Sequence, residues 1–103
     1  MARTAKRLGA GFADSNGTTA YTVPASTTTT IVSIIIANTG SADDAVTISL
    51  GGNKIVGDHV VVANDTMILE LKNAPVIINA SEEIYITGGS TGVYYYITGV
   101  EEV

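Results

Sequence analysis

Short runs in which β-branched residues alternate with small polar ones, each closed by turn residues, are the dominant feature of this sequence. The segment AVTISL, residues 45–50, shows this most clearly, because its large apolar residues occupy every second position. Such an alternation turns one side of a strand toward a core and the other toward solvent. The Gly51-Gly52 pair that follows is typical of a hairpin turn. No segment shows the 3.6-residue period of a helix, so the sequence predicts an all-β fold.

The alternating or apolar runs predict about eight strands, with a bulge or break expected at Gly57. They cover residues 19–23, 29–37, 45–50, 54–63, 66–71, 75–79, 82–87 and 93–100. Strands of this length and spacing are typical of a two-sheet antiparallel sandwich, either jelly-roll or Ig-like in its strand order. The predicted core consists of the large apolar residues on one face of each run: Val32, Ile34, Ile36, Val46, Ile48, Leu50, Met67, Leu69, Leu71, Ile84 and Ile86.

The first 17 residues differ from the rest of the chain. They show no alternation, and three of the five basic residues of the sequence lie in the first seven positions, whereas all ten acidic residues come from Asp14 onward. We therefore expect an extended, flexible and basic N-terminal arm over residues 1–17 and a sandwich domain over residues 18–103. Such an arm can order along an acidic groove of another protein. Its candidate contact residues are Arg3, Lys6, Arg7 and Leu8.

Composition argues against catalysis and against several classes of ligand. The chain has no cysteine and a single histidine, His59, so neither a thiolate metal site nor a nucleophile–base–oxyanion set can be assembled. The acidic pairs lie beside predicted turns, where charges keep strand edges soluble. The body is acidic, which disfavours nucleic acid as a partner, and no apolar run approaches the length of a membrane-spanning helix. The sequence predicts a non-enzymatic protein without cofactor or metal.

Strands that carry apolar residues on both faces indicate a contact surface, and they include residues 29–37, the segment VVV at 60–62 and residues 93–100. With Val32, Ile34 and Ile36 in the core, Ile31 and Ile35 are expected to face outward. In the segment VYYYITGV, Tyr95 is expected on the core face, which leaves Tyr94 and Tyr96 on the outer face. Exposed apolar surface of this kind usually marks a protein contact. The two tyrosines are compatible with a protein interface, a glycan-stacking platform or ordinary cross-strand packing.

The order of these segments resembles a group of small phage virion proteins. The resemblance covers about residues 18–100 and is carried by YTVPASTTTTIVSIIIANTGSADDAVTISLGG, VVVANDTMILEL and INASEEIYITGG. It implies a β-sandwich that is a structural part of the particle, assembled in the host cytoplasm. Capsid decoration or cement proteins of this kind bind the major capsid protein or another virion protein, often as trimers. The alternatives are a tail, baseplate or fibre-adaptor module and, outside the virion, a small carbohydrate-binding module that uses Tyr94 and Tyr96.

Overall fold

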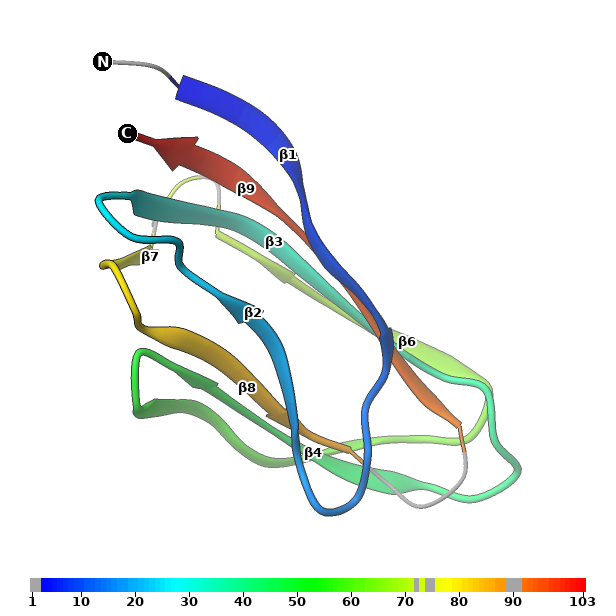
Figure 1. Cartoon of the computed structure of the whole chain (residues 1–103). Helices are drawn as coiled ribbons and strands as arrows, with labels where there is room; N and C mark the ends of the chain where they lie inside the picture. The colour runs from blue at the N-terminus through cyan, green and yellow to red at the C-terminus, as the bar shows by residue number, and fades with distance from the viewer. Residues whose placement is uncertain (1–2, 72, 74–75, 89–91) are drawn as a thin grey trace.

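Two antiparallel sheets pack face to face in the structure, a computed structural model that describes residues 3–71, 73, 76–88 and 92–103 (Figure 1). Over these residues the chain forms nine strands and no helix, which confirms the predicted all-β sandwich. All eight strands expected from the sequence are present, and each begins and ends within two residues of its predicted bounds. Pro75, the first residue of one predicted strand, and residues 1–2 of the predicted arm lie outside the described part of the chain.

The two sheets contain five and four strands. The five-stranded sheet has the order β1-β9-β3-β6, and β7 pairs with the remaining part of β3. Its strands are β1 (Arg3–Phe12), β9 (Val93–Glu102), β3 (Thr28–Asn38), β6 (Asp65–Glu70) and β7 (Val76–Ile78). The four-stranded sheet has the order β2-β8-β4-β5. Its strands are β2 (Thr18–Thr22), β8 (Glu83–Thr87), β4 (Asp44–Leu50) and β5 (Asn53–Val61).

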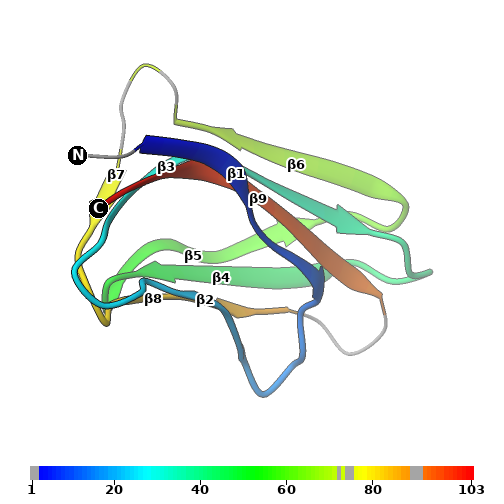
Figure 2. The ribbon, with the colours of Figure 1, turned by 45° about the horizontal axis from the view of Figure 1, so that its top comes forward.

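The strand pairs are nested like one long hairpin that has been rolled up. From the tight turn outward the pairs are β4 with β5, β3 with β6, β2 with β8 and β1 with β9, and successive pairs alternate between the two sheets. At the tight turn, Gly51 and Gly52 have φ angles of 59° and 84°, the left-handed conformations that a two-residue hairpin loop requires. Rolling places β9 beside β3 and β8 beside β4 (Figure 2). With the short β7 set aside, this order is that of a jelly roll.

The core lies between the sheets and consists mainly of isoleucine and valine. Most of the residues predicted for it are fully or almost fully buried: Ile34, Ile36, Val46, Ile48, Leu50, Leu71, Ile84 and Ile86. Met67 and Leu69 are only partly buried, because β6 is an edge strand. Tyr95 lies in the core with Val93 and Ile97, as the alternation of β9 predicted.

The prediction for the first half of β3 is wrong. Ile31, expected on the outer face, is 0% exposed, whereas Val32, expected in the core, is not among the buried residues. The register of β3 against β9 shifts between Ile31 and Ser33. Such a β-bulge adds one residue to one strand and reverses the alternation on one side of it. On β9, a Cβ added to Gly99 would lie 2.5 Å from the Thr30 carbonyl oxygen, so the backbones approach too closely for a larger residue.

The extended N-terminal arm is not confirmed. Residues 3–12 instead form β1, which pairs with β9 from Arg3 to Phe12, with a register shift between Arg7 and Gly9. The first five residues of β1 are exposed, so the strand has little apolar alternation from which it could be predicted. β1 is held by its backbone pairing and by a close approach to β2, where a Cβ on Gly9 would lie 2.5 Å from the Ala20 carbonyl oxygen.

Candidate functional site: the outer face of the five-stranded sheet

Large apolar side chains cover the outer face of the five-stranded sheet. Residues that lie directly opposite one another on neighbouring strands point to the same side, so strand register groups them in rows across the sheet. One row is Ala10, Tyr96, Ile35 and Ile68, and the next is Phe12, Tyr94, Ala37 and Thr66. These eight residues are called the apolar face below. Ile68 is 62% exposed and Tyr94 is 48% exposed, so large apolar side chains occupy solvent-exposed positions of the sheet.

The apolar face has local order of its own. The rings of Phe12 and Tyr94 meet edge to face, with centroids 5.6 Å apart and planes inclined by 66°. This is a favourable arrangement for an aromatic pair. In the adjoining row, the Ser33 and Thr98 hydroxyls are hydrogen-bonded to each other at 2.8 Å, so part of their hydrogen-bonding capacity is used within the chain.

The outer face of the four-stranded sheet is different in character. On its two central strands, β4 and β8, the outward residues are mostly small or polar: Ala45, Thr47, Ser49, Glu83, Tyr85 and Thr87. Tyr85 is engaged within the chain, since its hydroxyl donates to the Asn16 carbonyl oxygen at 3.1 Å. The asymmetry between the two outer faces shows that exposed apolar surface is not a general consequence of this composition. Adjacent apolar rows cross the five-stranded sheet, whereas the exposed apolar residues Ile55 and Val60 of the other sheet lie on its edge strand β5.

The structure brings together only some of the predicted contact residues. Ile35, Tyr94 and Tyr96 lie on the apolar face, and the outward position predicted for both tyrosines is confirmed. Arg3 and Arg7 lie on β1 at the margin of the same face, where Arg3 is 3.6 Å from Glu102 in an exposed ion pair.

The remaining three predicted residues are not part of this surface. Lys6 and Leu8 turn inward, toward Glu101 and the core respectively. Ile31 belongs to the core. Sequence reasoning missed Phe12, because it fell in the predicted arm, and Ile68, although the alternation of residues 66–71 already placed Ile68 opposite the core residues.

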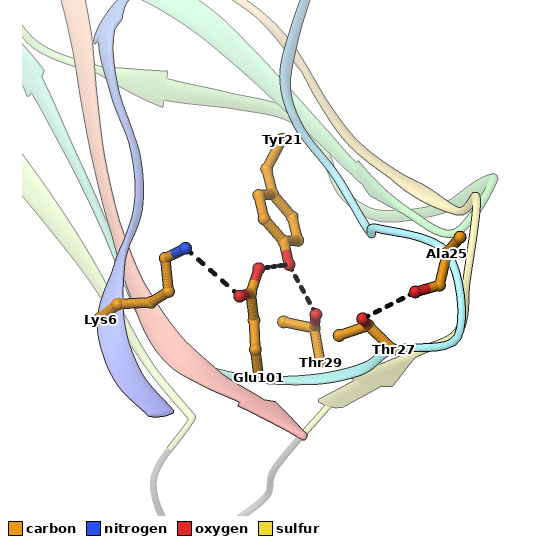
Figure 3. Close-up of polar contacts among 6 residues, drawn as sticks. All are labelled: Lys6, Tyr21, Ala25, Thr27, Thr29 and Glu101. Atoms are coloured by element: carbon orange, nitrogen blue, oxygen red, sulfur yellow. Dashed lines mark hydrogen bonds and ion pairs between the residues drawn. The ribbon is translucent and has the colours of Figure 1, made fainter. Parts of the chain in front are cut away.

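A second feature is a polar cluster that joins the two sheets near the chain ends (Figure 3). The Tyr21 hydroxyl, from β2, donates to Glu101 Oε2 on β9 at 2.5 Å, and Lys6 Nζ on β1 donates to Glu101 Oε1 at 3.3 Å. The Thr29 hydroxyl on β3 lies 2.7 Å from the Tyr21 oxygen. Because the single proton of Tyr21 goes to the carboxylate, Thr29 is the donor in this second bond.

The electrostatics of this cluster follow from its partial burial. Burial and the hydrogen bond to the Glu101 carboxylate raise the pKa of Tyr21 to about 12. The hydrogen bond from Tyr21 and the ammonium group of Lys6 hold the pKa of Glu101 below its ordinary value. The cluster is therefore a neutral tyrosine, an ionised glutamate and a lysine at neutral pH. Such a set stabilises the contact between the sheets, because both carboxylate oxygens of Glu101 accept a hydrogen bond from another strand.

The groups that could carry other chemistry are dispersed. His59 is exposed on β5, and the neighbouring Asp58 carboxylate accepts a hydrogen bond from Thr47 at 3.1 Å. The Asp14 carboxylate, in the turn after β1, accepts the Asn16 backbone N–H at 3.1 Å. Within residues 3–71, 73, 76–88 and 92–103, no three histidine or acidic side chains converge as a metal site would require. The same residues include no helix that is long and apolar enough to cross a membrane.

The sequence matches no protein-family model and has no significant match among curated proteins.

Proposed function

We propose that this protein is a non-enzymatic structural component of a virus particle, a capsid decoration or cement subunit that acts through protein contacts at its apolar face. The observation that carries the proposal is the exposed apolar surface on the outer face of the five-stranded sheet, including Ile68 at 62% and Phe12 at 44% exposure. Soluble proteins rarely leave large contiguous apolar patches uncovered unless another molecule binds there. The resemblance of residues 18–100 to small phage virion proteins supports the virion as the place where this contact is made.

The composition of the face favours a protein over a glycan. Sugar and other small-ligand sites combine aromatic surface with a few well-placed polar groups that fix orientation. The register neighbours of Tyr94 are Phe12 and Ala37, and those of Tyr96 are Ala10 and Ile35. None of these four side chains supplies a hydrogen-bond donor or acceptor. Aromatic residues surrounded by aliphatic ones are instead typical of the buried centre of a protein interface.

Such a subunit stabilises the particle by burying apolar surface at each of its contacts. Each contact removes apolar area from water, which contributes roughly 25 cal/mol per Å² before the cost of association is subtracted. Contacts that are individually weak become effective when particle symmetry repeats them, because subunits that bind at several points dissociate slowly. The major capsid protein, another virion protein or further copies of this chain are the proposed partners.

The test uses particles of the virus that encodes the chain, made with and without it. Purified protein is added to the deficient particles, and bound copies per particle are counted by quantitative mass spectrometry. We expect the wild type to bind and to raise the temperature at which the particles release their genome. Ile68→Lys, on the apolar face, should not bind. Val60→Lys is the matched control, since Val60 is similarly exposed, at 54%, but lies on the other sheet.

Three results bear on the proposal. Hundreds of copies per particle would support the decoration or cement role, and a few dozen or fewer would favour the tail, baseplate or fibre-adaptor alternative. Absence of the chain from purified particles would contradict a virion role altogether. Equal binding by Ile68→Lys and the wild type would show that the apolar face is not the contact.

A further inference from the structure

The apolar face is bounded by opposite charges on its two edge strands. One further register row crosses the sheet next to the apolar rows, and it consists of Arg7, Thr98, Ser33 and Glu70. Arg7 lies on β1, at one edge, and Glu70 lies on β6, at the other. Three strand spacings separate them, a distance of about 14 Å. The two charges are thus too far apart to pair within one chain, and both are exposed.

Opposite charges at opposite edges of one row are complementary under a two-fold rotation. If two copies meet face to face about an axis that lies in the interface and runs parallel to the strands, β1 of each copy covers β6 of the other. Residues of one row then meet residues of the same row in reverse order. Arg7 of each copy consequently faces Glu70 of the other, which makes two identical ion pairs. Face-to-face sheets with nearly aligned strands are a common packing arrangement.

We propose that the apolar face pairs with the same face of a second copy of this chain, in a symmetric dimer with Arg7–Glu70 ion pairs across the interface. The inference rests on the proposed role of the apolar face as a protein contact, and among the partners proposed above it names a further copy of this chain as the one that covers this face. A two-fold contact is isologous, so each complementary pair occurs twice. It differs from the trimer that the resemblance implied.

The sizes of the side chains agree with this pairing. The same axis places β9 of one copy over β3 of the other. In the apolar rows, the small Ala10 then faces the large Ile68, and the large Tyr94 faces the small Ala37. Large side chains that meet small ones can interdigitate, as facing sheets require. Tyr96 and Ile35, which are both large, meet at the centre, where an aromatic anchor is typical.

The alternative two-fold arrangement brings like charges together. An axis that lies in the interface but runs across the strands would place β1 over β1 and β6 over β6. The basic edge that carries Arg3 and Arg7 would then face itself, and Glu70 would approach Glu70. Like charges in an interface weaken association and exclude the wrong register. The charge pattern therefore selects the axis parallel to the strands.

The area available is sufficient for a reversible dimer. Five register rows, from Arg3 to Phe12 on β1, lie on the outer face; four of them cross four strands and the row of Arg3 crosses three. At strand spacings of about 4.8 Å and row spacings of about 6.8 Å, this corresponds to about 620 Å² per copy and about 1,240 Å² in total. That total lies at the lower end of specific interfaces, so we expect an equilibrium that responds to protein concentration.

The experiment measures the solution mass of the purified full chain by sedimentation equilibrium over a range of concentrations, without particles or partners. We expect monomer and dimer for the wild type. Arg7→Glu alone and Glu70→Arg alone should each weaken the dimer by at least about tenfold, because every ion pair becomes a repulsion. An equimolar mixture of the two variants should dimerise again, as should the double variant Arg7→Glu/Glu70→Arg. Circular dichroism of each variant confirms that the fold is retained.

Other outcomes would overturn the inference. They are a wild type that stays monomeric at all concentrations, a mass of three chains, single variants that dimerise like the wild type, and single variants whose mixture stays monomeric. The proposed function has a separate readout, since particle binding is counted independently. A dimer that binds no particle would support this inference and contradict the virion role. A monomer that binds particles through Ile68 would support the virion role and overturn this inference.

Discussion

The hydrogen bond from Tyr21 to Glu101 should be one of the strongest single polar contacts between the two sheets. Tyr21→Phe removes only the hydroxyl and leaves the ring, so Glu101 loses a partner at 2.5 Å while the packing is retained. The Glu101 side chain is only 14% exposed, so water can replace that partner only in part. Hydrogen bonds to charged groups contribute about 1.5–3 kcal/mol, and we expect a loss of about 2 kcal/mol. For a chain of this size, that lowers the unfolding temperature by about 8–16 °C.

The destabilisation caused by Tyr21→Phe should depend on pH in both the acidic and the alkaline range. The pKa of Glu101 is lower in the folded chain than in the unfolded chain, where it is about 4.3. The contribution of Glu101 to folding stability is therefore complete above the unfolded pKa and is lost as the pH falls through the folded pKa. The pKa of Tyr21 is raised to about 12. Its contribution is complete below the unfolded value of about 10 and is lost as the pH rises from there toward 12. The difference in the free energy of unfolding between the wild type and Tyr21→Phe should therefore become smaller at both low and high pH.

The assay is thermal and urea unfolding of both proteins between pH 3 and 11, followed by circular dichroism. Tyr85→Phe is the matched control, because it removes a tyrosine hydroxyl that donates to a neutral carbonyl, that of Asn16. A neutral hydrogen bond of this kind contributes about 1 kcal/mol, with no dependence on acidic pH. The reasoning would be refuted if Tyr21→Phe were no more destabilising than Tyr85→Phe, or if its effect were the same at pH 3 and pH 7.

Two further pairs of substitutions test the fold at the points where sequence and structure differ. Gly9→Ala should destabilise the chain by at least about 2 kcal/mol, because its Cβ would lie 2.5 Å from a carbonyl oxygen of β2, whereas Gly57→Ala, with its nearest neighbour at 3.6 Å, should be close to neutral. Equal unfolding midpoints for these two variants in urea would argue against the close approach of β1 and β2. Ile31→Ala should cost about 2–5 kcal/mol because Ile31 is fully buried, and Ile35→Ala should cost less than about 1 kcal/mol. A reversed order of the latter two, measured by the same method, would restore the original assignment of faces.

The candidate site was predictable where the alternation of a strand is unbroken. Tyr94 and Tyr96 face outward because β9 alternates without interruption from Val93 to Gly99. Ile31 was misplaced because a bulge interrupts β3, and the one available signal was Gly99 on the neighbouring strand. An isolated glycine within a strand indicates a bulge or a close backbone approach. Phe12 had no comparable signal, since the exposed first half of β1 lacks apolar alternation.

The sequence by itself determined the strands, their turns and most of the core, because period-two patterning and turn chemistry are local properties. It determined neither the strand order nor the register. Backbone pairing can join strands of almost any sequence, so β1 was recruited to the edge of β9 although its residues show little preference for it. Only the tertiary structure placed Lys6 beside Glu101, 95 residues away, and Arg7 in the same row as Glu70. Both features depend on which strands are neighbours in a sheet, and the strand order is set by how the whole chain packs around its core.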